Sequence, residues 1–360
     1  MNVARGLLYR SPHYLQYRVY IVPFRQKSYS QLHIFLKGTV MATLPSIERI
    51  THKFEWHYGW VSYYVILHIL ATGGLLFTLA QLLGGLLQGA DAVFATHITP
   101  QVLSWQLFAI PWWGRILQAV LTTTFGYYYW RFGLYSITFM HLYYSHTAFR
   151  VLRRWIHWVT TLGFYSALQG WTALWTGWHR QHHELVDTKK DRTSPQVYGF
   201  WHAHMFVWMK KQFLKPAPRK YSWHLRHPEY RESMKFESYY VPIAIFMAFG
   251  VPTLVGSLLL NPLGGFLMGC TRLVALYHTT WTINSRMHTH GDRVEGGGTA
   301  TNTRSRFFSW MVVGEPGHAN HHRWPWSYRR GEVDPGADLI EWLAKRGWVS
   351  GLKLAPLFKK

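Results

Sequence analysis

The stretch Val61–Leu87, VSYYVILHILATGGLLFTLAQLLGGLL, carries no charged residue over 27 positions. A hydrocarbon core of about 30 Å needs roughly 20 apolar residues of α-helix, so this segment is long enough to cross a membrane with some tilt. Charged residues make up 15% of the 360 residues and aromatic residues 18%, whereas soluble domains usually contain about 25% charged residues. The composition therefore predicts a membrane protein. The mean hydropathy of −0.08 also predicts a sizeable polar part outside the lipid.

Three further apolar segments follow, at residues 116–140, 239–260 and 262–283. Arg131 interrupts the second span and Arg272 the fourth, and Asn261 with Pro262 makes the turn between the third and fourth. The segments before Val61, between 149 and 235, and after 286 are strongly basic, which places them in the cytoplasm by the positive-inside rule. We therefore expect an all-α, multi-pass membrane protein: four transmembrane helices and a helical cytosolic cap, with both termini and the functional site on the cytoplasmic side.

Residues 1–40 are basic, rich in Ser and Tyr, and contain no acidic residue. They are interpreted either as an organelle transit segment or as an extension upstream of a true start at Met41. The remaining residues, 41–360, are expected to form a single domain.

The net charge of +22, from 38 Lys and Arg against 16 Asp and Glu, suits anionic lipid, nucleic acid or an acidic protein. Because the basic residues border the predicted spans, membrane lipid explains them and we expect no nucleic-acid partner. The single cysteine, Cys270, excludes an internal disulfide, a four-cysteine zinc site and a cysteine-held iron–sulfur cluster. The 22 histidines are therefore the main chemical signal.

Nine histidines gather in four short motifs. These are HLYYSH with His141 and His146, HRQHH with His179, His182 and His183, NSRMH with His288, and HANHH with His318, His321 and His322. On a helix, positions i, i+3 and i+4 fall within about 100° of arc, so each HxxHH motif presents three imidazoles from one face. Isolated histidines such as His68 and His97 are interpreted as packing or interfacial residues.

His141 and His146 do not fit one face of a regular helix. Five residues correspond to about 140° around the axis, so the two side chains would reach different metals or lie where the helix unwinds.

Nine imidazoles exceed the ligand number of one octahedral ion, so they indicate two metals with four or five nitrogens each. Neutral nitrogen ligands suit iron, copper or zinc, but zinc has no redox chemistry, and hydrolytic two-metal sites usually include bridging carboxylates. The carboxylate di-iron pattern needs two Glu-x-x-His pairs, and only Glu315 with His318 fits it. An all-histidine di-iron centre for oxygen chemistry on a lipid chain is the interpretation that remains.

The order HxxxxH, HRxHH, NSxxH, GExxHxxHH resembles the integral-membrane fatty acyl desaturases of the stearoyl-CoA (delta-9) type. The similarity runs from about Val61 to about Trp348 and includes RLVALYHTTWTINSRMH at residues 272–288. The resemblance implies two iron ions held by the nine histidines, and oxygen-dependent insertion of a cis double bond into a fatty acyl chain. It also implies that Asn284 holds a metal-bound water and that Trp281 lines the substrate tunnel.

The tunnel must select a carbon by shape, because methylenes offer no polar handle. Phe125, Tyr129 and Gly133 recur at four-residue intervals upstream of His141, and they are candidates for the closed end of the tunnel. The alternative is that this stripe packs against another helix.

The basic residues of the family's coenzyme A site are only partly present. Leu142 stands where the family usually has Arg, and Gly177 with Trp178 replaces its Arg-Asp pair, which leaves CoA, lipid or another acyl carrier open. Lys210 and Lys211 resemble the family's later basic pair and are candidates for head-group binding.

The chain contains no HPGG, CxxC or GxGxxG motif for an electron-transfer module. A separate donor, such as cytochrome b5 or ferredoxin, is therefore expected to dock on the basic cytosolic face. Two alternatives stay open: a di-iron lipid hydroxylase or other oxygenase, and a membrane electron carrier with heme held by paired histidines such as His68 and His278.

Overall fold

The computed structural model describes residues 54–94, 110–315 and 317–359. The basic N-terminal segment at 1–40, His97 and Pro316 lie outside these residues. The described residues belong to one unit, Ile47–Lys360, and they are mostly helical, as the sequence predicts.

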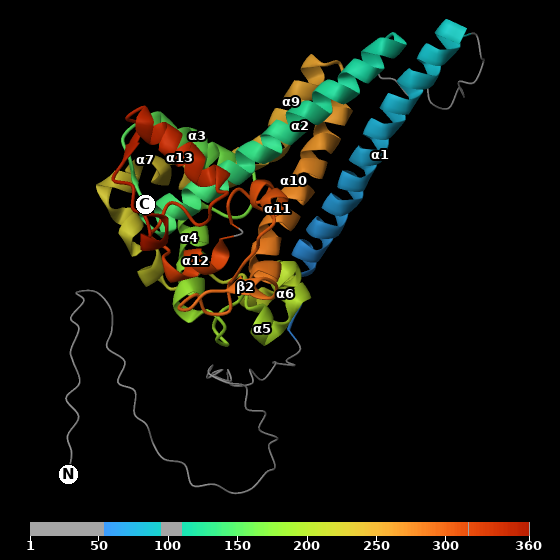
Figure 1. Cartoon of the computed structure of the whole chain (residues 1–360). Helices are drawn as coiled ribbons and strands as arrows, with labels where there is room; N and C mark the ends of the chain where they lie inside the picture. The colour runs from blue at the N-terminus through green and yellow to red at the C-terminus, as the bar shows by residue number, and fades with distance from the viewer. Residues whose placement is uncertain (1–53, 95–109, 316, 360) are drawn as a thin grey trace, which may run out of the picture. The chain divides into compact units, whose positions relative to one another are not determined.

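Four long helical segments lie side by side and form a stem (Figure 1). They are α1 (Tyr58–Phe94), α2 (Trp112–Met140), the run from α8 (Tyr240–Ile245) through a π-helical turn (Phe246–Gly250) to α9 (Val251–Leu258), and α10 (Pro262–Ser285). Each of the four apolar segments is therefore helical. The turn at Asn261 is confirmed: its side chain accepts a hydrogen bond from the Gly264 amide, and Pro262 occupies the first helical position.

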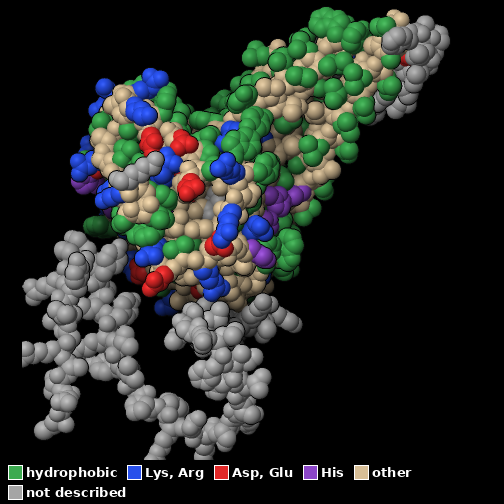
Figure 2. All heavy atoms as spheres, in the orientation of Figure 1, with side chains coloured by type: hydrophobic (Ala, Val, Ile, Leu, Met, Phe, Trp, Pro, Cys, Tyr) green, Lys and Arg blue, Asp and Glu red, His purple; other side chains and the backbone are tan. Residues whose placement is uncertain are grey.

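Two helical stretches are long and apolar enough to cross a membrane by themselves: Tyr58–Val93, and Pro228–Leu258, which contains α8 and α9. An 18-residue window in each has a mean hydropathy of 1.9. The helices α2 and α10 do not reach this level, because arginine, threonine and histidine side chains interrupt their apolar residues. Hydrophobic side chains cover the stem, whereas charged side chains gather on the cap (Figure 2).

Arg131 and Arg272, which interrupt the second and fourth apolar segments, are buried and have polar partners on the cap. Arg131 donates to the carbonyl oxygen of Trp310 at 2.7 Å and lies over the Trp310 ring. Arg272 donates to the carbonyl oxygen of Ser166 at 2.8 Å. Buried cations need such acceptors, so both residues attach the stem to the cap.

The cap consists of short helices and turns. The helices are α3 (Arg154–Tyr165), α4 (Thr172–Leu185), α5 (Pro195–Tyr198), α6 (Phe200–His204), α7 (Arg231–Met234), α11 (Arg306–Met311), α12 (His318–Arg323) and α13 (Pro335–Lys345). The 3-10 turns are Phe206–Met209, Lys211–Phe213, Arg219–Tyr221, Trp223–Arg226, Pro228–Tyr230, Glu237–Tyr239, Arg286–His288 and Pro356–Phe358.

Two small antiparallel sheets complete the cap. Strand β1 (Arg150–Val151) pairs with β4 (Val349–Ser350), so that Val151 lies opposite Val349. Strand β2 (Asp292–Arg293) pairs with β3 (Thr301–Asn302), so that Arg293 lies opposite Thr301. The first sheet connects the end of α2 to the C-terminal segment, and the second lies between the metal-site motifs of α10 and α12.

The contact between α9 and α10 depends on glycine. A Cβ atom added to Gly265 would lie 2.7 Å from the Cα of Gly256 and would also meet the carbonyl oxygen of Pro252. We expect Gly265→Ala to destabilise the α9–α10 hairpin by about 1–3 kcal/mol, because the two backbones must separate. The melting temperature of the detergent-solubilised protein measures this change.

The matched control is Gly73→Ala in α1, where an added Cβ meets nothing within 4 Å. It should leave the melting temperature unchanged or raise it, since alanine is the better helix former. Equal effects of the two substitutions would show that the α9–α10 contact is not close.

Candidate metal centre

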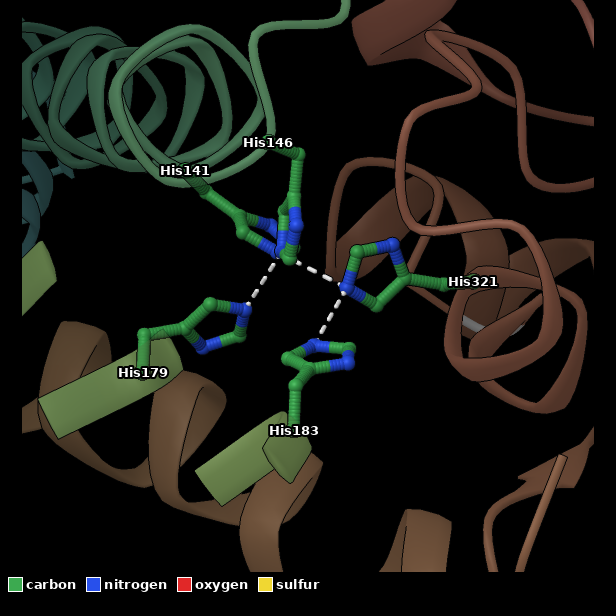
Figure 3. Close-up of side chains that lie close together, drawn as sticks. All are labelled: His141, His146, His179, His183 and His321. Carbon is green, nitrogen blue, oxygen red and sulfur yellow. Dashed lines mark hydrogen bonds between the residues drawn. The ribbon is translucent and has the colours of Figure 1, made fainter. Parts of the chain in front are cut away.

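Nine buried or half-buried histidines converge where the stem meets the cap. They fall into a five-histidine group, His141, His146, His179, His183 and His321, and a four-histidine group, His182, His288, His318 and His322. Within each group the potential ligand nitrogens all lie within 4.8 Å of one another. This is the division into four and five nitrogens expected for two metals. Figure 3 shows the rings of the five-histidine group turned toward a common centre.

The helix geometry explains how each HxxHH motif serves both groups. On α4, His179 and His183 point to the five-histidine group and His182 to the other. On α12, His318 and His322 belong to the four-histidine group and His321 to the other. In both motifs the i, i+4 pair shares a group, because these positions lie one above the other on a helix.

His141 and His146 both belong to the five-histidine group, and their ring centroids are 5.0 Å apart. The expectation that they reach different metals is therefore wrong, and the alternative, a change in the helix, is correct. Residues His141–Ser145 form a π-helical turn at the end of α2. Hydrogen bonds from i to i+5 widen this turn, so residues five apart return to nearly the same face.

The nitrogens that face each other are Nε2 throughout. The Nε2–Nε2 separations are 2.9 Å for His141–His321 and His146–His179, 3.0 Å for His183–His321 and 3.1 Å for His288–His318. They are 3.2 Å for His318–His322 and 3.3 Å for His182–His322.

Carboxylates accept hydrogen bonds from the second ring nitrogen, Nδ1, of three of these histidines. The Nδ1 atom of His141 donates to Glu315 Oε1 at 3.1 Å, that of His318 to Glu315 Oε2 at 3.4 Å, and that of His182 to Asp191 at 3.0 Å. A neutral ring with its proton on Nδ1 presents a lone pair at Nε2. Lone pairs 3 Å apart repel each other unless a cation lies between them, so this donor set fits two metal ions.

Burial keeps the imidazoles in the neutral form that binds metal. Desolvation holds the pKa well below the usual histidine range for six of them: His146, His179, His183, His288, His321 and His322. His182 is the exception, because the neighbouring Asp191 carboxylate raises its pKa against the effect of burial.

Glu315 joins the two groups electrostatically. It accepts from one histidine of each group and forms a buried ion pair with Arg330. Although burial opposes ionisation, Arg330 and His141 hold the pKa of Glu315 well below its usual range. Arg330 is 1% exposed and also pairs with Asp334. The sequence interpretation weighed Glu315 only as part of an incomplete Glu-x-x-His ligand pattern and missed this supporting role.

A cavity of about 240 Å³ reaches both groups. His141 and His179 of one group line it, as do His182 and His318 of the other. Most of its other lining residues are apolar or aromatic, including Tyr64, Leu134, Ile137, Leu174, Trp175, Tyr277 and Trp281. Trp281 and Asn284 both lie on this wall, where the family resemblance places them.

The three residues proposed for the closed end of the tunnel have other contacts. Phe125, Tyr129 and Gly133 are not among the residues that line the cavity in the described part of the chain. Tyr129 donates to the Met247 carbonyl oxygen at 2.6 Å, and a Cβ on Gly133 would meet Leu276 at 2.5 Å. Tyr129 and Gly133 therefore face neighbouring stem segments.

The two lysines chosen for head-group binding also lie off the cavity lining. Lys211 forms an ion pair with Glu55 at 3.1 Å, and Lys210 lies over the rings of Phe54 and Trp56. Both residues hold the segment that precedes α1. Arg192 does line the cavity, and its guanidinium lies over the Trp178 ring.

These features define a helical protein in which two all-histidine groups that could each hold a metal ion lie beside an apolar cavity, and in which two helices could cross a membrane. Residues 110–331 match the fatty acid desaturase family. The chain belongs to this family.

Named relatives agree with this assignment. The chain is 31% identical to a probable acyl-CoA desaturase of Schizosaccharomyces pombe over 58% of this chain and 44% of that protein. It is 29% identical to an sn-1 stearoyl-lipid 9-desaturase of Synechocystis sp. over 71% of this chain and 75% of the relative. It is 26% identical to an acyl-CoA 5-desaturase of Anemone leveillei over 71% and 74% of the two chains. The resemblance to fatty acyl desaturases of the delta-9 type is confirmed, and the chain is an enzyme of this class.

Proposed function

We propose that this enzyme inserts a cis double bond into a fatty acyl chain in an oxygen-dependent reaction, with two iron ions held by the nine histidines. The observation that carries the proposal is the convergence of nine Nε2 atoms beside an apolar cavity. When bound, iron would supply the redox chemistry that activates oxygen and removes hydrogen from two adjacent methylenes.

Residues of the protein position the acyl chain and the ligand rings, and they exclude water from the site. Apolar and aromatic side chains of the cavity hold the acyl chain, and their shape alone decides which methylenes lie beside the histidines. Glu315 and Asp191 keep protons on the Nδ1 atoms and thereby orient the ligand rings. Asn284, on the cavity wall, is our candidate for holding a metal-bound water.

The proposal includes four membrane spans formed by the stem segments, with the cap and the metal centre in the cytoplasm. On the face that Figure 2 shows, hydrophobic side chains cover the stem and charged side chains gather on the cap, which supports this arrangement. Electrons would come from a separate acidic donor, such as cytochrome b5 or ferredoxin, that docks on the basic cap.

Expression in a desaturase-deficient host with a matched electron donor tests the activity. Gas chromatography with mass spectrometry should detect new monounsaturated acyl chains. Hydroxylated chains would indicate an oxygenase instead, and unaltered lipids would contradict both activities.

The cavity wall predicts which residues set chain length. Ile137 lies on α2 and lines the cavity, so Ile137→Ala should enlarge it and shift the product profile toward longer acyl chains. One methylene in an apolar pocket changes the discrimination between substrates by about 1–3 kcal/mol. The ratio of longer to shorter products should therefore rise roughly tenfold.

Tyr129→Phe is the matched control on the same helix, because Tyr129 contacts Met247 instead of the cavity. It should leave the chain-length profile unchanged. The reverse pattern, with a shift for Tyr129→Phe and none for Ile137→Ala, would restore the stripe at Phe125, Tyr129 and Gly133 as the tunnel end.

A further inference from the structure

Three histidines outside the metal centre form a continuous chain of contacts. His68 lies on α1, His278 on α10 and His204 on α6. The Nε2 atoms of His68 and His278 are 3.1 Å apart, and His278 Nδ1 is 3.0 Å from His204 Nε2. The chain therefore connects two stem helices and one helix of the cap.

The two ends of the chain fix where its protons lie. His68 Nδ1 is 2.6 Å from the Tyr64 carbonyl oxygen, which can only accept, so this nitrogen carries the proton. In neutral rings His278 then donates from Nε2 to His68, and His204 donates from Nε2 to His278. The Ser285 hydroxyl lies 3.0 Å from His204 Nδ1, the remaining acceptor, and 3.0 Å from the Trp281 carbonyl oxygen, so its one proton is shared between these two acceptors. The two histidine–histidine contacts and the contact of His68 with the Tyr64 carbonyl are satisfied by three neutral rings with one direction of donation.

This arrangement differs from a metal site. In the metal centre the Nε2 atoms of several rings converge on one point, whereas His278 uses its two nitrogens for two different neighbours. A heme iron between His68 and His278 would need about 4 Å between their nitrogens, twice a metal–nitrogen bond. The separation of 3.1 Å is too short, so the electron-carrier alternative is not supported.

The row of three histidines lies directly behind one wall of the cavity. The Trp281 ring, 3% exposed, has its centroid 5.3 Å from that of His278 and 6.0 Å from that of His204. It stacks on Tyr277 at 5.1 Å and meets the edge of Tyr64 at 5.5 Å. Trp281, Tyr277 and Tyr64 all line the cavity. The His68 end of the chain is anchored to the backbone of Tyr64, and the Ser285 end lies one turn beyond Trp281 on α10.

We propose that His68, His278 and His204 are positioning residues that fix the Trp281 wall and thereby determine which methylene of the acyl chain lies at the metal centre. This inference rests on the proposed function. A wall defined only by packing could tilt within the apolar cavity, whereas a hydrogen-bonded chain across three helices has one geometry. Because a displacement of about 1 Å can change reactivity a hundredfold, a loosened wall should admit neighbouring carbons.

The test compares His278→Leu with His278→Gln in the full-length enzyme, expressed with its electron donor. Leucine removes both hydrogen bonds, whereas the glutamine amide can accept from His204 and donate to His68. We expect His278→Leu to raise the fraction of products with a displaced double bond roughly tenfold, with wild-type iron content. Glutamine should restore most of the wild-type position. The positions are determined by mass spectrometry of derivatised products.

Two further variants separate a connected chain from general packing. His204→Leu should give the same shift, and the double variant His204→Leu/His278→Leu should be no worse than either single one, since each breaks the same chain. The control is His157→Leu, a buried cap histidine bonded to Tyr144 and Ser233, which should leave the double-bond position unchanged.

An unchanged double-bond position in His278→Leu, or the same displacement in His157→Leu, would overturn the inference. If His278→Leu fails to accumulate, His68→Leu provides the same comparison, because it removes only the terminal link. Failure of the proposed function is distinguishable, since the wild-type enzyme would then form no double bond at all.

Discussion

Replacing His321 by alanine is expected to abolish desaturation and to lower the iron content from two ions per chain toward one. The His321 Nε2 atom lies 2.9 Å from that of His141 and 3.0 Å from that of His183 within the five-histidine group (Figure 3). Loss of residues that merely support metal ligands costs about 10–100-fold in metal affinity or activity. Loss of a ligand should cost more than about a hundredfold.

Elemental analysis of the purified protein and chromatography of the host lipids measure the two effects of His321→Ala. The control is His202→Ala, a buried cap histidine that belongs to neither group and bonds to the Arg192 carbonyl oxygen. It should keep both ions. Full iron content and activity in His321→Ala would show that the five-histidine group is not a metal site.

Substituting Glu315 by glutamine should weaken iron binding about 10–100-fold without removing any ligand. Glu315 accepts from His141 in one group and from His318 in the other. Glutamine has nearly the same shape but only one accepting oxygen, so one imidazole loses the partner that keeps its proton on Nδ1. The buried ion pair with Arg330 is lost as well, and breaking such pairs typically costs about 3–5 kcal/mol of stability.

Iron retention during dialysis against a graded series of chelator concentrations measures the affinity of Glu315→Gln. Glu341→Gln is the matched control, because Glu341 pairs with Arg329 on the cap, away from the histidines. Equal retention in the two variants would contradict the role assigned to Glu315.

The metal centre could be predicted from the sequence because its information is local. Histidines at i, i+3 and i+4 share a helix face whatever the tertiary structure, so HRQHH and HANHH can be recognised as candidate ligand motifs from the sequence alone. The count of nine indicated two ions. The π-helical turn at His141 could not be predicted, since local helix type depends on the packing around it. The sequence analysis came near this turn only through its alternative that His141 and His146 lie where the helix unwinds.

The cavity lining and the groups that support the ligand histidines could not be predicted without the three-dimensional fold. The stripe at Phe125, Tyr129 and Gly133 is a real helix face, but spacing does not tell which neighbour a face meets. The sequence predicts head-group binding for Lys210 and Lys211, but their partners in the structure are residues 54–56, far away along the chain. Glu315 and Arg330 meet across 15 positions through a buried contact that no periodic pattern signals.

Anomalous diffraction from the purified protein at the iron absorption edge tests the central claim most directly. The account predicts two iron peaks, one within the five-histidine group and one within the four-histidine group, each surrounded by Nε2 atoms. A single peak, a peak at the zinc edge alone, or density away from both groups would contradict it.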